Sequence, residues 1–162
     1  MKYIVTKPYT SYTLTEAIKK LEGYCAYQDR CHKEVATKLK EMRMIPEAID
    51  QIMTHLIQHN FLSEERFARS YARGKFNIKK WGKLKITREL ELREISKFNI
   101  QIALREIDDG AYIATLDALA RKKLASLSES DPQKKRKKLI DYLMYRGWES
   151  HLIYDKIREL IP

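Results

Sequence analysis

Hydrophobic residues recur along the chain in a pattern that occurs three times. The first copy has an apolar residue at six positions between 35 and 56. A shift of 51 residues, then of a further 53, finds an apolar residue at every corresponding position. Amphipathic helices alone give some matches of this kind, but they do not explain a break that all copies share. The pattern therefore predicts a tandem repeat. The three sets are Val35, Leu39, Met44, Ile49, Met53 and Leu56; Ile86, Leu90, Ile95, Ile100, Leu104 and Ile107; and Leu139, Leu143, Trp148, Ile153, Ile157 and Leu160.

The shared break predicts two helices joined by a tight turn in every copy, at residues 43–46, 94–97 and 146–150. Pro46 suits the first turn of a helix, and Gly147 suits a left-handed helix end. Side chains that can accept hydrogen bonds from unpaired helix amides also stand at these turns. They are Ser96, Asn99 and Ser150.

A further helix is predicted ahead of each pair, at residues 15–27, 63–78 and 111–127. Ser63 is the expected cap of the second, and Asp131 with Pro132 opens a later helix. Three residues of the second helix should face inward, namely Phe67, Tyr71 and Phe76. We expect an all-α fold of three tandem three-helix repeats in an elongated, curved array. The expected divisions are a mobile N-terminal arm (1–12, extended at 3–5) and repeats at 13–60, 61–109 and 110–162.

Composition agrees with a packed helical protein. Of 162 residues, 44% are hydrophobic, and only five Gly and four Pro interrupt them. Cys25 and Cys31 are too few for a disulfide framework and have no further zinc ligands at suitable spacing, so we expect reduced thiols. Neither a signal peptide nor an apolar stretch long enough to span a membrane is evident, so we expect a cytoplasmic protein that contacts no membrane.

The net charge of +10 favours a polyanionic partner, and nucleic acid is the leading candidate. Ten lysines and arginines lie between residues 66 and 93, where the acidic residues are only Glu89 and Glu91. These basic residues stand on both sides of a predicted turn at Trp81. Trp81 either packs in that corner, the favoured interpretation, or stacks on a base. Three arginines share one helix face, which either contacts phosphates or is simply solvated. They are Arg66, Arg69 and Arg73.

A second basic run, residues 134–138, follows Pro132. It contacts DNA or acidic protein, or it only aids solubility. The residues predicted to bind nucleic acid or a nucleoprotein filament are Arg66, Arg69, Arg73, Lys79, Lys80, Lys83, Lys85, Arg88, Lys134, Lys135 and Arg136.

Catalytic chemistry is not indicated. No nucleophile with a base, metal cluster or phosphate-binding loop can be assembled from the sequence. His55 and His59 stand four residues apart, a spacing that suits a metal, but no third ligand is near. Asp108 and Asp109, beside Gly110, indicate a turn at a helix end rather than acid-base catalysis. We expect no enzymatic activity, metal or cofactor.

Three segments together resemble the signature of the RecX family of regulatory proteins. They are Phe61-Leu62-Ser63-Glu64-Glu65-Arg66-Phe67-Ala68; Lys80-Trp81-Gly82 with Ile86 and Glu89-Leu90; and Tyr145-Arg146-Gly147-Trp148. The resemblance covers residues 13–160. The chain departs from the family pattern at four positions, with Ser63 and Glu64 in place of Asp, Tyr145 in place of Arg and Trp148 in place of Phe.

The resemblance implies three tandem three-helix repeats. It also implies binding to the filament of the RecA recombinase and DNA, single- or double-stranded and without sequence preference, with modulation of strand exchange and ATP hydrolysis in DNA repair and recombination. Inhibition by a monomer is the expected mode. One alternative is a helix-turn-helix transcription regulator, against which the threefold repetition argues. A second is a helical scaffold that binds acidic proteins.

Overall fold

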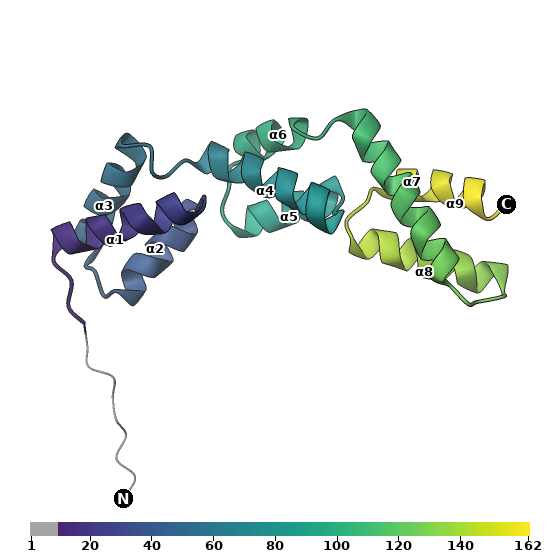
Figure 1. The fold of residues 1–162 in the computed structure, drawn as a ribbon, viewed down its shortest axis with the longest axis horizontal. Helices are drawn as coiled ribbons and strands as arrows, with labels where there is room; N and C mark the ends of the chain where they lie inside the picture. The colour runs from purple at the N-terminus through teal and green to yellow at the C-terminus, as the bar shows by residue number, and fades with distance from the viewer. Residues whose placement is uncertain (1–9) are drawn as a thin grey trace, which may run out of the picture. The chain divides into compact units, whose positions relative to one another are not determined.

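The computed structural model describes residues 10–162, which form helices and no strands (Figure 1). Residues 1–9 of the predicted arm, with the extended piece at 3–5, lie outside the described residues. The all-α prediction is confirmed. Unit 1 ends at Glu64, and unit 2 spans Glu65–Pro162. The helices of the described range are α1 (Leu14–Tyr27), α2 (His32–Glu41), α3 (Pro46–Gln58), α4 (Glu64–Lys79), α5 (Lys83–Leu92), α6 (Lys97–Arg105), α7 (Asp109–Ser126), α8 (Pro132–Tyr145) and α9 (Ser150–Leu160).

In unit 1, α1 and α2 both pack against α3. The core contains side chains from all three helices, placed one turn apart along each, such as Leu21, Leu39 and Ile52, all fully buried. Cys25 and Cys31 are both buried and unbridged, which confirms the prediction of free thiols.

The threefold repeat is confirmed by the backbone as well as by burial. None of the eighteen repeat positions is exposed. The second residue after the second helix of each copy is left-handed: φ is 57° at Arg43, 61° at Glu94 and 84° at Gly147. At each corner the next amide donates to the carbonyl five residues earlier, as the Met44 amide does to the Leu39 carbonyl at 3.1 Å. This arrangement is the Schellman end of a helix, repeated at the sequence spacing of the apolar pattern.

Helix starts follow the predicted capping chemistry at most places. The Ser96 hydroxyl accepts a hydrogen bond from the Asn99 amide at 3.2 Å, and the Asp131 carboxylate accepts one from the Gln133 amide at 2.9 Å. The prediction for Ser150 is wrong, because Glu149 is the N-cap of α9 and no side chain caps that end. Glu149 instead binds a tyrosine of α7, as described below.

The predicted inward face of α4 is largely confirmed. Phe67 and Phe76 are buried, and Tyr71 is half-buried. None of the helices within residues 10–162 combines the length and apolar character that crossing a bilayer requires.

Candidate nucleic-acid interface

The excess positive charge belongs to unit 2. Residues 65–162 carry 23 of the 32 Lys and Arg residues and 14 of the 22 Asp and Glu residues, whereas residues 10–64 carry 7 and 8. Long-range attraction of a polyanion is therefore a property of the second unit, while the described part of the first is close to neutral.

The predicted arginine face of α4 is partly compensated by a carboxylate from elsewhere in the chain. Arg69 and Arg73 both bind Glu106 at the end of α6, and the Arg73 nitrogen lies 3.3 Å from its carboxylate oxygen. Arg69 also pairs with Glu65 at 2.9 Å. Arg66 is half-buried. The face thus has less uncompensated charge than local sequence suggests, because Glu106 is more than 30 residues away along the chain.

Unit 2 contains a backbone contact between the α4–α5 corner and the α8–α9 corner, which we call the corner lock. The Gly82 amide, between α4 and α5, donates to the Arg146 carbonyl, between α8 and α9, at 2.8 Å. The Leu84 amide donates to the Gly147 carbonyl at 3.1 Å. Backbone groups that would otherwise be orphaned at a helix start and a helix end satisfy each other here.

Two glycines make this approach sterically possible. A Cβ on Gly82 would lie 2.3 Å from the Gly147 carbonyl oxygen, and one on Gly147 would lie 2.2 Å from the Lys85 Cβ. Arg43 and Glu94 show that a left-handed helix end tolerates a side chain at equivalent corners. Gly147 is therefore required mainly for close packing, and not only for its φ.

Side chains reinforce the lock from both corners. Trp148, only 1% exposed, donates its indole N–H to the Lys80 carbonyl at 3.2 Å. The Arg146 guanidinium donates to the Lys79 carbonyl at 2.6 Å. Tryptophan thus supplies a donor that the phenylalanine typical of the family signature lacks. The lock brings together two motifs that are more than 60 residues apart in sequence.

Tyr112 of α7 joins both corners through its hydroxyl. It accepts a hydrogen bond from the Lys83 amide at 2.9 Å and donates one to the Glu149 carboxylate at 2.6 Å. Burial, with the bond to Glu149, raises the pKa of this hydroxyl far above its usual value of 10. Tyr112 therefore stays a neutral donor, suited to structure rather than to proton transfer.

Aromatic rings and ammonium groups alternate among residues of α4, α5 and the two corners joined by the lock. Lys75 lies 5.2 Å from the Tyr71 ring centroid and 4.9 Å from that of Trp81. Lys85 lies 4.6 Å from the Trp81 centroid and 4.3 Å from that of Tyr145, which is 78% exposed. These distances fall within cation–π range. We call this set the basic–aromatic row: Tyr71, Lys75, Trp81, Lys85 and Tyr145.

The row has the chemistry of a surface that binds single-stranded nucleic acid. Within residues 10–162 no carboxylate pairs with the ammonium of Lys75 or Lys85, so both are available to phosphates. Exposed aromatic faces accept stacked bases without distinguishing their sequence. Trp81 is half-buried in its corner and takes part in the row, and its stacking on a base stays a prediction.

The other predicted binding residues lie in varied surroundings. Arg88 and Lys134 are exposed, and Lys135 is half-buried. Arg136 is held at the end of the chain, where its guanidinium donates to the Ile161 carbonyl at 3.0 Å. In the same run, Lys137 and Lys138 pair with carboxylates. The run is therefore not uniformly available to a partner.

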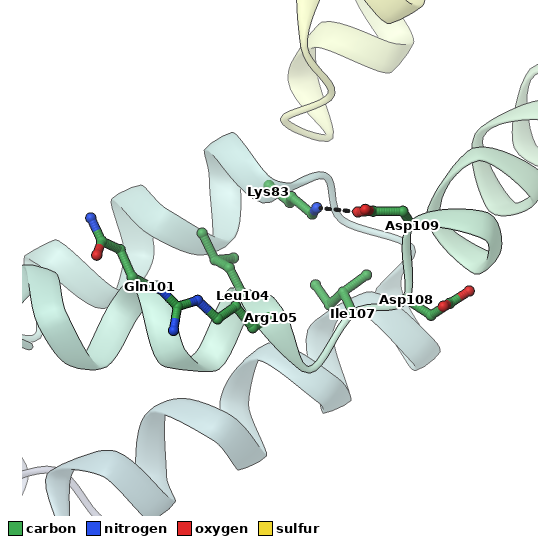
Figure 2. Close-up of a pocket in the computed structure, with 7 residues that line it drawn as sticks. All are labelled: Lys83, Gln101, Leu104, Arg105, Ile107, Asp108 and Asp109. Carbon is green, nitrogen blue, oxygen red and sulfur yellow. Dashed lines mark hydrogen bonds and ion pairs between the residues drawn. The ribbon is translucent and has the colours of Figure 1, made fainter.

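Lys83 lines a cavity of about 530 Å³ that carries both signs of charge (Figure 2). Its ammonium points at Asp109, 3.3 Å away, as the dashed line in Figure 2 marks. Asp108 accepts a hydrogen bond from the Ala111 amide at the start of α7. The helix-end interpretation is confirmed for Asp108, the N-cap of α7, whereas Asp109 pairs with Lys83, which lies 26 residues earlier in the chain.

His55 of α3 and His59, which directly follows that helix, each contact another group of unit 1. His55 lies 2.7 Å from a Glu22 carboxylate oxygen, and the His59 ring bonds the His55 carbonyl at 2.9 Å. No group of three or more potential metal ligands occurs within the described range.

The sequence predicts neither Tyr71 nor Tyr145 as a binding residue, whereas the fold places both in the row. The helical spacing of Tyr71 predicts an inward-facing position, and Tyr145 stands out in the sequence only as a departure from the family motif. The available signals in the sequence are Trp81, which belongs to the row, and Arg146, which follows Tyr145 in the motif.

Comparison with known proteins identifies relatives of this chain. Two family models match, described as the second three-helix domain of RecX, over residues 63–104, and the third, over residues 111–157. The chain is 31% identical over 146 residues to the regulatory protein RecX of Prosthecochloris aestuarii, covering 90% of this chain and 94% of that protein. It is 32% identical over 133 residues to the RecX of Chlorobium phaeobacteroides, covering 82% and 85%.

A solved structure shares the fold. The crystal structure of RecX from Lactobacillus salivarius superposes with a TM-score of 0.80 at 25% identity and covers 91% of this chain and 96% of its own. The corner lock joins residues from both matched domains.

Proposed function

This chain belongs to the RecX family of regulatory proteins, and from that premise we propose that it binds the RecA–DNA filament and inhibits its recombinase and ATPase activity. The role is regulatory rather than catalytic, and the partner contacts belong to unit 2. The observation that carries the proposal is the basic–aromatic row, held in place by the corner lock.

The row is suited to a nucleoprotein surface. Cations at fixed positions attract the DNA backbone, and aromatic faces take up exposed bases. A monomer bound there would compete with productive contacts between filament subunits or with the bound strand. Because phosphate contacts release counterions, the interaction should weaken as salt concentration rises.

The proposal is tested by RecA-dependent strand exchange with the added protein. Wild type should slow product formation, and the double variant Lys75→Gln, Lys85→Gln should slow it less at equal concentration. The matched control is Lys19→Gln, Lys40→Gln, which makes the same charge change on exposed lysines of unit 1. This control should act as wild type does.

Equal inhibition by the row variant and wild type would remove the row from the interface. Tight binding to one duplex sequence without RecA would instead favour a helix-turn-helix regulator, the alternative class. DNA-independent binding to acidic proteins alone would favour a scaffold.

A further inference from the structure

A second basic feature of unit 2 is a groove among α4, α7 and α8, which shares no residue with the row. The groove has a volume of about 500 Å³, within the range of sites that hold ligands. None of its lining residues, all in the described part of the chain, is acidic. Five are basic: Lys79, Lys80, Lys122, Lys123 and Arg146.

The cations of the groove differ from about half of the other cations in unit 2, which have a carboxylate partner. Elsewhere lysines pair with carboxylates, as Lys137 does with Asp141 at 2.6 Å and Lys156 with Asp117 at 2.7 Å. Within residues 10–162, no ion pair involves any of the five groove cations. Like charges gathered in one concave surface repel each other, and an anion bound there relieves that repulsion.

Two groove cations are also held in place before any ligand arrives. The Arg146 guanidinium bonds the Lys79 carbonyl and lies 4.8 Å from the Tyr142 ring centroid. The Lys123 ammonium lies 4.9 Å from the same ring on the groove wall. Because these positions are fixed by the fold, an anion binds without the full entropic cost of ordering long side chains.

We propose that this groove binds phosphate groups of a nucleic-acid backbone, as a second DNA contact beyond the basic–aromatic row. The identification of the ligand as nucleic acid rests on the proposed function. The groove has cations and no carboxylate, which suits phosphates, and phosphate contacts carry no sequence information. The contact is therefore independent of base sequence.

Lys122 and Lys123 give the sharpest test, because neither takes part in the corner lock or the row. Their charges are removed in Lys122→Gln, Lys123→Gln. The matched control is Lys97→Gln, Arg105→Gln, which removes two exposed charges from α6 in the same unit, outside the groove and the row. Binding of each variant to a fluorescent oligothymidylate strand is measured by anisotropy from 0.05 to 0.3 M NaCl, without RecA.

Loss of two phosphate contacts should lower the slope of log K against log salt by about 1.4 and weaken binding about 25-fold at 0.1 M salt. The control should keep the slope of the wild type. The inference is overturned if groove and control variants lose affinity equally, if the groove variant binds as wild type does, or if wild type binds no DNA.

Failure of this inference is distinguishable from failure of the proposed function. If wild type inhibits RecA and the groove variant binds DNA normally, the assignment of the groove as a DNA contact is wrong and the regulatory role stands. If the groove variant alone loses DNA affinity while wild type leaves RecA unaffected, the groove stands and the regulatory role is wrong.

Discussion

Replacement of Gly82 by alanine tests the corner lock directly. The backbone of Gly82 has φ −76° and ψ 165°, which alanine adopts without strain, so any loss of stability must come from contacts. The added Cβ would lie 2.3, 2.5 and 2.6 Å from backbone atoms of Gly147 and Trp148. Backbone atoms cannot rotate aside as a flexible side chain does, so the two corners must separate.

The magnitude follows from that separation. Ordinary contact begins near 3.4 Å, so the corners must move apart by about 1 Å. The bond from the Gly82 amide to the Arg146 carbonyl would lengthen from 2.8 Å to beyond hydrogen-bonding range, and the Leu84 bond would weaken with it. Losing one or two such bonds and the packing around them should lower the free energy of unfolding by about 2 to 4 kcal/mol.

Gly74→Ala is the matched control for Gly82→Ala. Gly74 lies inside α4, and a Cβ there meets no atom within 4 Å. Alanine should therefore stabilise the chain by about 0.5 to 1 kcal/mol through its better helix propensity. Urea denaturation followed by circular dichroism gives both values, and hydrogen exchange at the Leu84 amide reports on the lock. Wild-type stability and unchanged Leu84 protection in Gly82→Ala would refute this reasoning.

Three further predictions concern single side chains. Tyr112→Phe should lower the free energy of unfolding, measured by urea denaturation, by about 1 to 3 kcal/mol, because it leaves the polar partners of the hydroxyl unsatisfied. A loss below about 0.5 kcal/mol would contradict this reasoning. Tyr145→Ala should weaken binding of a single strand about 5- to 100-fold by anisotropy, whereas Tyr154→Ala, also exposed, should not; equal effects would remove the stacking role. Hydrogen bonds, first from Arg121, lower the pKa of Asp117, so its contribution to stability is present above about pH 3.8 and is lost as the pH falls further. The stability difference between wild type and Asp117→Asn should therefore narrow below that pH in denaturation curves, and a constant difference would contradict the assignment.

The repeat and its corners could be predicted because they depend on local spacing. Apolar residues one helical turn apart define each buried face, and Pro46 and Gly147 mark helix ends by their own backbone preferences. The left-handed residues Arg43 and Glu94 could not be predicted, since their conformation is imposed by the Schellman bonds rather than favoured by their side chains.

The candidate site was less accessible to sequence reasoning, because it depends on contacts between distant segments. Glu106 compensates two arginines that precede it by more than 30 residues. Tyr145 joins a row of residues that lie 60 to 74 positions earlier, and nothing in its local sequence indicates that neighbourhood. The distribution of basic residues along the sequence points to the unit that contains the candidate site. Only the fold separates the cations that pair with carboxylates from those that do not.

The proposed regulation of RecA is tested by measuring ATP hydrolysis by RecA on single-stranded DNA during titration with this protein. Hydrolysis should fall as the protein is added, and the Lys75→Gln, Lys85→Gln variant should need a higher concentration for the same effect. A hydrolysis rate that stays constant up to a large molar excess over RecA would contradict the account.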